Sequence, residues 1–279
     1  MAKPAMLPEA GPTEAGPTEA GPNETGPSIT RIREVGQPDS VIGRVNAEHW
    51  VGRLYMRRFS PYATRLLLRT SISANGVTWL MIVSGVLAAA VLTLPGVVAA
   101  VGTVLLVQCQ LLFDCADGEV ARWRDTLSPA GVYLDRIGHY STEAALAVAL
   151  GIRADGGWGS IDGWTTLGLL AAVLVLLVKS ETDLVDAARA RGGRAVLVDT
   201  GSPPGAAGLH RLRRTIGFLP FFRMFIAVEF SFLALAAALV DATAGSLVGT
   251  RTLLLVFLPA LAVTAAGHLA SVLASSRLR

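Results

Sequence analysis

The sequence predicts an all-α integral membrane protein with six transmembrane helices and an N-terminal amphipathic helix at the membrane interface. Of its 279 residues 52% are hydrophobic, and the mean hydropathy is +0.52, which favours embedding in a membrane over one or two soluble domains. Six apolar runs are each long enough to cross about 30 Å of hydrocarbon. The two cysteines, Cys109 and Cys115, give no basis for a disulfide framework.

Residues 1–36 are dominated by a five-residue repeat. It reads Glu-Ala-Gly-Pro-Thr from Glu9 and from Glu14, and it continues with changes from Glu19 and Glu24. Because the repeat has almost nothing to bury, we expect a disordered low-complexity tail. No apolar segment follows the first residue, so a cleaved signal peptide is not expected.

Residues 37–75 are predicted to form a juxtamembrane amphipathic segment. From Val45 to Arg69 aromatic side chains such as Trp50 alternate with arginines. Such a helix lies in the membrane interface, with its Arg groups near anionic headgroups and its aromatic rings at the acyl boundary. Pro61 is expected to break it into two pieces. The competing interpretation is a solvated basic linker.

The six apolar runs make up a predicted transmembrane domain over residues 76–273, followed by a cytoplasmic tail at 274–279. A tight turn at Leu94-Pro95-Gly96 separates the first two runs. We place the spans near 76–93, 94–114, 132–152, 164–184, 216–240 and 250–273.

The distribution of basic residues predicts the orientation of these spans. With a cytoplasmic N-terminus the outer loops contain only Arg153 and Arg251, and the other 22 Lys and Arg residues lie on the cytoplasmic side or at its boundary. The positive-inside rule therefore favours a multi-pass protein of the cell membrane in this orientation. Arg outnumbers Lys 22 to 2, a bias that we associate with a bacterial origin.

A group of polar residues lies at the boundary between the second and third spans. Asp114 and Asp117 are three residues apart, and Asp135 and His139 are four apart, so each pair shares one face of a helix. If the two helices pack as neighbours, the four side chains converge and need a cation. Carboxylate-rich sites of this kind suit Mg²⁺ or Mn²⁺. On the competing account, these acids cap helices and point to water.

Small residues and an arginine surround these acids. Gly118, Ala121 and Gly131 let a backbone or a flat ligand come close, and Arg122 offers a fork of donors suited to phosphate. Together with the acids and a metal, they describe a site for a diphosphate, which faces the cytoplasm in the predicted orientation.

The pattern resembles a known family. Asp114, Asp117, Gly118, Ala121, Arg122, Gly131 and Asp135 match seven of the eight fixed positions of D-x-x-D-G-x-x-A-R, eight residues, G-x-x-x-D-x-x-x-D, and His139 stands at the eighth. This is the signature of the CDP-alcohol phosphotransferases, membrane enzymes of phospholipid synthesis.

The resemblance implies a substrate, a metal and a reaction. A substituted phosphate group would pass from a CDP-alcohol, such as CDP-diacylglycerol, to an acceptor hydroxyl with release of CMP. Asp114, Asp117 and Asp135 would hold Mg²⁺ or Mn²⁺ on the diphosphate. Membrane lipids and a second copy of the chain in a homodimer are the expected partners, and no nucleic acid is expected.

Two further parts of the chain are compared with the family. The segment before the first span is similar to the family's Pro-Asn-x-x-Thr, with Ala74 in place of Pro, and this favours a role for Asn75 and Thr78 in nucleotide binding, with helix capping as the alternative. Arg189 and Arg191 follow the fourth span, where related enzymes hold a phosphorylated acceptor. Anchoring to anionic lipid explains these two arginines equally well.

The departure at His139 carries its own prediction. An imidazole is a competent base at neutral pH and an acceptable ligand for Mn²⁺, so we predict that His139 acts both as a metal ligand and as the base for the acceptor hydroxyl. Glu143 lies one turn further along the same face and is predicted to orient the imidazole.

Two other functions are open at this point. The chain could be a relative that binds CDP-lipid but has lost turnover with the change at position 139. Alternatively, Arg223, Glu229 and His268, charged or titratable residues in the last two spans, could form the polar pathway of a small transporter. That alternative leaves the acidic motif unexplained.

Overall fold

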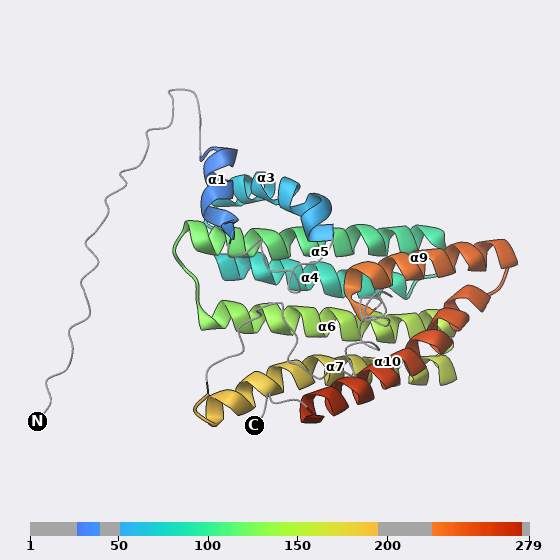
Figure 1. The fold of residues 1–279 in the computed structure, drawn as a ribbon. Helices are drawn as coiled ribbons and strands as arrows, with labels where there is room; N and C mark the ends of the chain where they lie inside the picture. Colours follow the sequence, from blue (N-terminus) through green and yellow to red (C-terminus); the bar gives the residue numbers. More distant parts are fainter. Residues whose placement is uncertain (1–26, 40–50, 195–224, 275–279) are drawn as a thin grey trace, which may run out of the picture.

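The computed structural model describes residues 27–39, 51–194 and 225–274 (Figure 1). Within these ranges all regular structure is helical, as predicted. The elements are α1 (Ile29–Gly36), a π-helix η1 (Gly52–Met56), α3 (Arg57–Leu68), α4 (Ala74–Leu92), α5 (Val97–Trp123), α6 (Pro129–Ala154), α7 (Gly163–Arg191), α9 (Ala227–Ala244) and α10 (Val248–Ala274).

The long helices form a bundle whose buried core contains residues of α4, α5, α6, α7, α9 and α10. α5 packs against α4 and α9, while α7 packs against α6 and α10. Figure 1 shows α1 and α3 lying across the outside of α5, at the end of the bundle where α5 finishes and α6 begins. The chain therefore covers this end of α5 with elements that precede the first long helix.

Among the described residues, five helices are long and apolar enough to cross a membrane, namely α4, α5, α7, α9 and α10. The prediction of a multi-pass helical membrane protein is confirmed, but the count of six spans is not. The predicted third span corresponds to α6, which has 26 residues and packs against α4 and α7. It carries Asp135, Arg136, His139 and Glu143, so its composition alone does not mark it as a span.

Two sequence predictions about the N-terminal region are wrong. The disordered tail was expected to reach residue 36, but Ile29–Gly36 is a helix that Ser28 caps by accepting a hydrogen bond from the N–H of Arg31. Pro61 was expected to break the juxtamembrane helix, yet α3 continues through it. The Arg57 carbonyl, which a prolyl residue four positions on cannot satisfy, instead accepts a hydrogen bond from Gln37 Nε2 at 2.8 Å.

The other end of the bundle is closed by Arg153. The predicted turn at Leu94-Pro95-Gly96 is present, and Gly96 adopts a φ of 89°, which favours glycine. The Arg153 side chain is 2% exposed and donates hydrogen bonds to the carbonyls of Leu94 and Gly96 at 2.7 and 3.0 Å. This arginine is therefore part of the packing between helices rather than a solvated loop residue.

Candidate metal and diphosphate site

The polar motif lies on the ends of two adjacent helices. α5 continues to Trp123, so Asp114 and Asp117 lie on its last three turns. α6 begins with Pro129 in its first turn, and the Ser128 hydroxyl accepts a hydrogen bond from the N–H of Gly131 at 3.1 Å. Asp135 and His139 follow on the second and third turns of α6. The short connection between the helices brings the two pairs to the same end of the bundle.

Three of the four predicted metal ligands converge. His139 Nε2 lies 3.1 Å from Asp114 Oδ1 and 3.4 Å from Asp135 Oδ1. One ligand atom from each of these residues lies within 4.8 Å of the other two. Two carboxylates and an imidazole at this separation fit a divalent cation that accepts mixed oxygen and nitrogen ligands.

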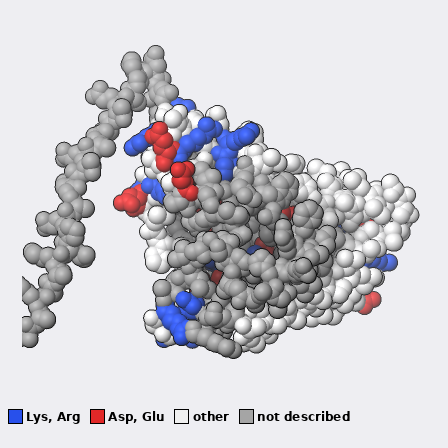
Figure 2. Space-filling view, in the orientation of Figure 1, with Lys and Arg blue, Asp and Glu red and all other residues white. Residues whose placement is uncertain are grey.

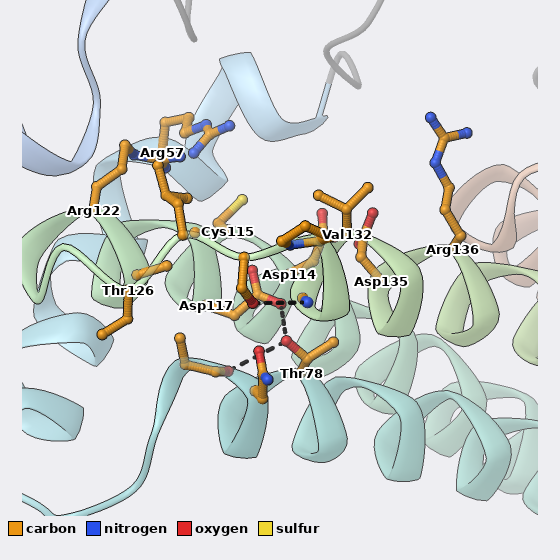
Figure 3. A pocket seen from close by; sticks show the side chains of 18 residues that line it. Arg57, Thr78, Asp114, Cys115, Asp117, Arg122, Thr126, Val132, Asp135 and Arg136 are labelled. Atoms are coloured by element: carbon orange, nitrogen blue, oxygen red, sulfur yellow. Dashed lines mark hydrogen bonds between the residues drawn. The ribbon is translucent and has the colours of Figure 1, made fainter. Parts of the chain in front are cut away.

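Asp117 is placed differently. It is absent from this group of three, and Thr78 Oγ1 on α4 donates a hydrogen bond to Asp117 Oδ2 at 2.7 Å (Figure 3). Asp114 and Asp117 were predicted to project from one face of the helix. In the structure Asp117, three residues further along α5, is turned toward α4, and Asp114 faces α6. Thr78 therefore reaches the site through Asp117.

A cavity of about 730 Å³ lies beside these side chains. Its wall is formed by α3, α4, α5, α6 and the connection between α5 and α6. All six residues predicted to bind a nucleotide line it, together with the three aspartates (Figure 3): Asn75, Thr78, Gly118, Ala121, Arg122, Gly131, Asp114, Asp117 and Asp135. Sequence reasoning thus identified most of the polar wall.

The predicted close approach at the small residues is seen at Gly131. A Cβ added there would lie 3.2 Å from Asn75 Oδ1, tighter than most contacts of real side chains. At Gly118 an added Cβ would lie 3.0 Å from a terminal nitrogen of Arg122. Both glycines therefore leave room for the polar side chains that line the cavity.

Two arginines in the wall were not assigned to the site from the sequence. Arg57 comes from α3, and Arg136 follows Asp135 on α6. Arg136 forms an ion pair with Asp183 of α7 at 2.6 Å. Arg57 belongs to the segment that was predicted to lie in the membrane interface. No residue pattern near Arg57 in the sequence indicates that its side chain faces the cavity.

Glu143 pairs with α7. Glu143 Oε1 accepts a hydrogen bond from Lys179 Nζ of α7 at 2.9 Å, and its Oε2 is buried without a hydrogen-bond partner in the described part of the chain. The i+4 spacing puts Glu143 and His139 on one side of α6, and α7 supplies a cation for the carboxylate. The orienting role of Glu143 toward the imidazole stays a prediction.

The predicted acceptor residues lie apart from the cavity. Arg189 and Arg191 are in the last turn of α7, and neither lines the cavity. The polar contacts of α7 nearer to the site are made by Asp183, which accepts a hydrogen bond from Tyr140 as well as the ion pair with Arg136. The acceptor role of Arg189 and Arg191 stays a prediction.

The described residues of the transporter alternative lie on different helices, His268 on α10 and Glu229 on α9. His268 Nδ1 lies 2.8 Å from Glu181 Oε2 of α7, which gives it a partner inside the protein. Glu229 is on the first turn of α9. Arg223 lies outside the described residues.

Comparison with known proteins places the motif in a family. Residues 71–179 match the family described as CDP-alcohol phosphatidyltransferase. The matched segment contains α4, α5, α6 and the first part of α7, and it includes the three aspartates and His139. A comparison of the chain with curated proteins gives no match.

Proposed function

Because residues 71–179 form a domain of the CDP-alcohol phosphatidyltransferase family, we propose that this chain transfers a substituted phosphate group from CDP-diacylglycerol to an acceptor hydroxyl and releases CMP. The observation that carries the proposal is the position of the acidic cluster. Asp114, Asp135 and His139 meet at one end of a helical bundle, beside a cavity that arginines also line. A volume of about 730 Å³ is in the range of small-molecule sites.

The residues divide into three groups in this proposal. Asp114, Asp135 and His139 would hold Mg²⁺ or Mn²⁺, which neutralises charge on the diphosphate and on the CMP leaving group when bound. Asp117 is kept in place by Thr78 and would complete the ligand set from the α4 side. Asn75, Gly118 and Gly131 would shape the wall against the nucleotide.

His139 is predicted to act both as a metal ligand and as a base, but only its Nε2 faces the acidic cluster. Nε2 is the atom that faces Asp114 and Asp135, so in the ligand role it cannot also take the acceptor proton. A carboxylate at this position would offer two oxygens and could do both. We therefore propose that His139 acts as the base only if Asp114 and Asp135 hold the metal during the reaction and His139 is not a ligand.

One observation favours a second candidate, a CDP-lipid-binding relative with impaired turnover. A protonated Nε2 donates to Asp114 and lies 3.4 Å from Asp135, so it satisfies these carboxylates in place of a cation. Binding of a metal and protonation of His139 then exclude each other. Replacing His139 with Asp separates the two candidates, because an impaired enzyme gains CMP release with this change, whereas a wild type that already turns over does not depend on it.

The site is proposed to face the cytoplasm of a bacterial cell membrane, with lipid chains entering sideways between helices and a polar acceptor entering from the water. α6 is proposed as a sixth span, since it runs the length of the bundle between α4 and α7 (Figure 1). A homodimer is proposed as the working assembly. Arg189 and Arg191 are proposed to guide a phosphorylated acceptor toward the cavity from the end of α7.

The test is CMP release by purified full-length protein in nanodiscs, with CDP-diacylglycerol and a panel of acceptors that includes glycerol phosphate and inositol phosphate. We expect CMP only when a divalent metal and one of the acceptors are both present. An active wild type inhibited by EDTA supports the transferase. Binding of CDP-diacylglycerol without CMP release from any acceptor would favour the impaired relative.

A further inference from the structure

Helices α1 and α3, with η1 between them, form a roof over the cavity, and this roof is fastened to α5 at three points. We define the roof as residues 29–37 and 52–70. Glu119 binds its middle, Arg122 binds the C-terminal end of α1, and Arg124 binds the turn after α3. Glu119 and Arg122 lie on the last turns of α5, and Arg124 is its C-cap, so all three follow shortly after Asp114 and Asp117.

The contact at Glu119 is the most buried of the three. Its side chain is fully buried, and it accepts hydrogen bonds from Gln37 Nε2 at 2.8 Å, from Thr64 Oγ1 at 2.6 Å and from the Ser60 hydroxyl. Burial of a carboxylate is tolerated only where such donors compensate for lost water. Three donors supplied by the roof therefore fix its position against α5.

The other two contacts hold the edges of the roof. Arg122 Nε donates to the Gly36 carbonyl at 2.7 Å, and a terminal nitrogen of Arg124 donates to the Thr70 carbonyl at 2.9 Å. A Cβ added at Gly36 would lie 3.1 Å from Glu119 Cγ, so α1 lies close against α5. The roof is a docked part of the site rather than a loosely attached interfacial helix.

Arg57 is carried by this roof into the cavity wall. Its backbone carbonyl is held by Gln37 Nε2, and Gln37 is itself held by Glu119. The Arg57 side chain lines the cavity, and one terminal nitrogen lies 3.9 Å from Glu119 Oε1, longer than a hydrogen bond. Figure 3 shows Arg57 above Asp114, on the side of the cavity away from Thr78.

The charges in the wall indicate what Arg57 can bind. Three aspartates and three arginines line the cavity, and each arginine has a partner in the protein: Arg136 pairs with Asp183, Arg122 donates to the roof, and Arg57 pairs with Glu119 at 3.9 Å. With a divalent cation on the acids, a ligand that carries two phosphate groups still needs positive charge on its other side. A guanidinium supplies a fork of donors that matches phosphate oxygens.

We propose that Arg57 binds the diphosphate of the nucleotide-linked substrate from the roof side and that Glu119 is the positioning residue that holds the roof, and Arg57 with it, over the acids. This inference rests on the proposed function. It assigns a binding role to the helix that precedes the spans, which lies outside residues 71–179. Arg57 acts on the substrate directly, whereas Glu119 acts only through the roof.

The test compares Arg57→Gln with Arg58→Gln, a matched change at the next residue, which is exposed and does not line the cavity. Full-length protein is assayed in nanodiscs for CMP release at varied CDP-diacylglycerol, and binding of soluble CDP is followed as the rise in the thermal unfolding midpoint. We expect Arg57→Gln to raise KM for CDP-diacylglycerol at least about 10-fold, with a smaller change in kcat, and to abolish the rise with CDP. Arg58→Gln should match wild type.

Two further variants separate binding from structure. Arg57→Lys should recover part of the loss, because an ammonium keeps the charge without the fork. Glu119→Ala should raise KM in the same way and also lower the unfolding midpoint without ligand, which Arg57→Lys should not do. If Arg57→Gln does not fold, Arg57→Lys against Arg58→Lys provides the comparison.

Failure of this inference differs from failure of the proposed function. An active wild type with Arg57 variants equal to the Arg58 variants in KM and in the CDP effect overturns the role of Arg57 alone. A wild type that binds CDP without turnover overturns the transfer reaction, and the CDP effect still tests Arg57. A wild type that neither binds CDP nor releases CMP overturns both.

Discussion

At the scale of single residues, the carboxylates at the two ends of the bundle differ in what surrounds them. Asp155, at the end without the cavity, accepts hydrogen bonds from the N–H groups of Asp162 and Thr165 at 2.8 Å. Asp114 and Asp135 instead face each other across His139 Nε2. The oxygens of Asp155 accept hydrogen bonds at the start of α7, whereas those of the acidic cluster are proposed to bind a cation.

The first prediction concerns that cation. Asp114→Asn and Asp135→Asn each remove a charged ligand, so CMP release should fall at least about 100-fold, and the thermal stabilisation by Mn²⁺ should shrink. The control is Asp125→Asn, an exposed acid in the connection to α6 whose φ of 51° also suits Asn. Equal activity in all three variants, or wild-type activity in EDTA, would contradict a metal mechanism.

A second residue prediction is a pH dependence at Asp155. Partial burial acts to raise the pKa of Asp155, but hydrogen bonds from Thr165 and from the backbone N–H groups of Asp162 and Trp164 outweigh it and hold that pKa below its ordinary value. A lowered folded-state pKa stabilises the fold above the unfolded pKa of about 3.9 and is lost as the pH falls through the folded-state pKa.

We therefore expect Asp155→Ala to unfold at a lower temperature than wild type at pH 7, by the equivalent of about 1 kcal/mol for a lost helix cap. The gap should narrow as the pH falls from about 4 and close as the pH passes the lowered folded-state pKa, because only there does the wild-type carboxylate become protonated in the folded protein. A gap of constant size between pH 7 and pH 3 would mean that the hydrogen bonds do not depend on the charge.

At the scale of elements, the sequence predicts what depends on neighbouring residues and misses what depends on distant ones. The apolar runs and the turn at Leu94-Pro95-Gly96 are local, and they appear close to where they were expected. The docking of the roof is not local, since Glu119 binds Ser60 across 59 residues and Arg122 binds Gly36 across 86. A contact between residues far apart in the sequence also explains why Pro61 does not break α3. Gln37 donates to the Arg57 carbonyl in place of the hydrogen bond that Pro61 cannot supply.

Helix crossings are a second property that the sequence did not reveal. α6 and α7 meet at two glycines, where a Cβ on Gly151 would lie 2.7 Å from the Trp164 carbonyl oxygen and one on Gly168 would lie 2.8 Å from that of Ala147. The nearest obstacles are backbone atoms, which cannot rotate away as a side chain can. The contact of α6 with α7, and hence the distance from Lys179 to Glu143, depends on the absence of side chains here.

The element-scale prediction follows from this crossing. Gly151→Ala should destabilise the protein by about 1–3 kcal/mol, because the added methyl group must push α7 away from α6. Gly159→Ala is the matched control, since nothing lies within 4 Å of a Cβ at that position, and it should change stability by less than about 0.5 kcal/mol. Thermal unfolding in detergent measures both, and equal midpoints would show that α6 and α7 can separate at little cost.

At the scale of the whole molecule, charge is concentrated at one end of the bundle. In the view of Figure 2, most described Lys and Arg side chains lie at the end where α1, α3 and the acidic cluster are, with few at the opposite end. Arg153 and Arg251, the two basic residues of the predicted outer side, donate to backbone carbonyls, Arg251 to that of Ala154 at 3.0 Å. Arg153 is buried and Arg251 is exposed, so of these two only Arg251 presents its charge to the water on that side.

The last prediction is the orientation that this asymmetry implies. Basic residues resist transfer across the membrane during insertion, so the end with the cavity should remain in the cytoplasm, where a water-soluble acceptor can reach it. In a background with Cys109 and Cys115 replaced by Ala, a cysteine at Gly159 should react with an impermeant maleimide added to intact cells, and one at Gly192 should react only after lysis. Both positions are exposed and lie at opposite ends of α7. A difference in labelling therefore reports the side of the membrane on which each cysteine lies and not a difference in its exposure. Labelling of Gly192→Cys from outside, with Gly159→Cys protected, would place the cavity on the outer face and remove the case for a cytoplasmic substrate.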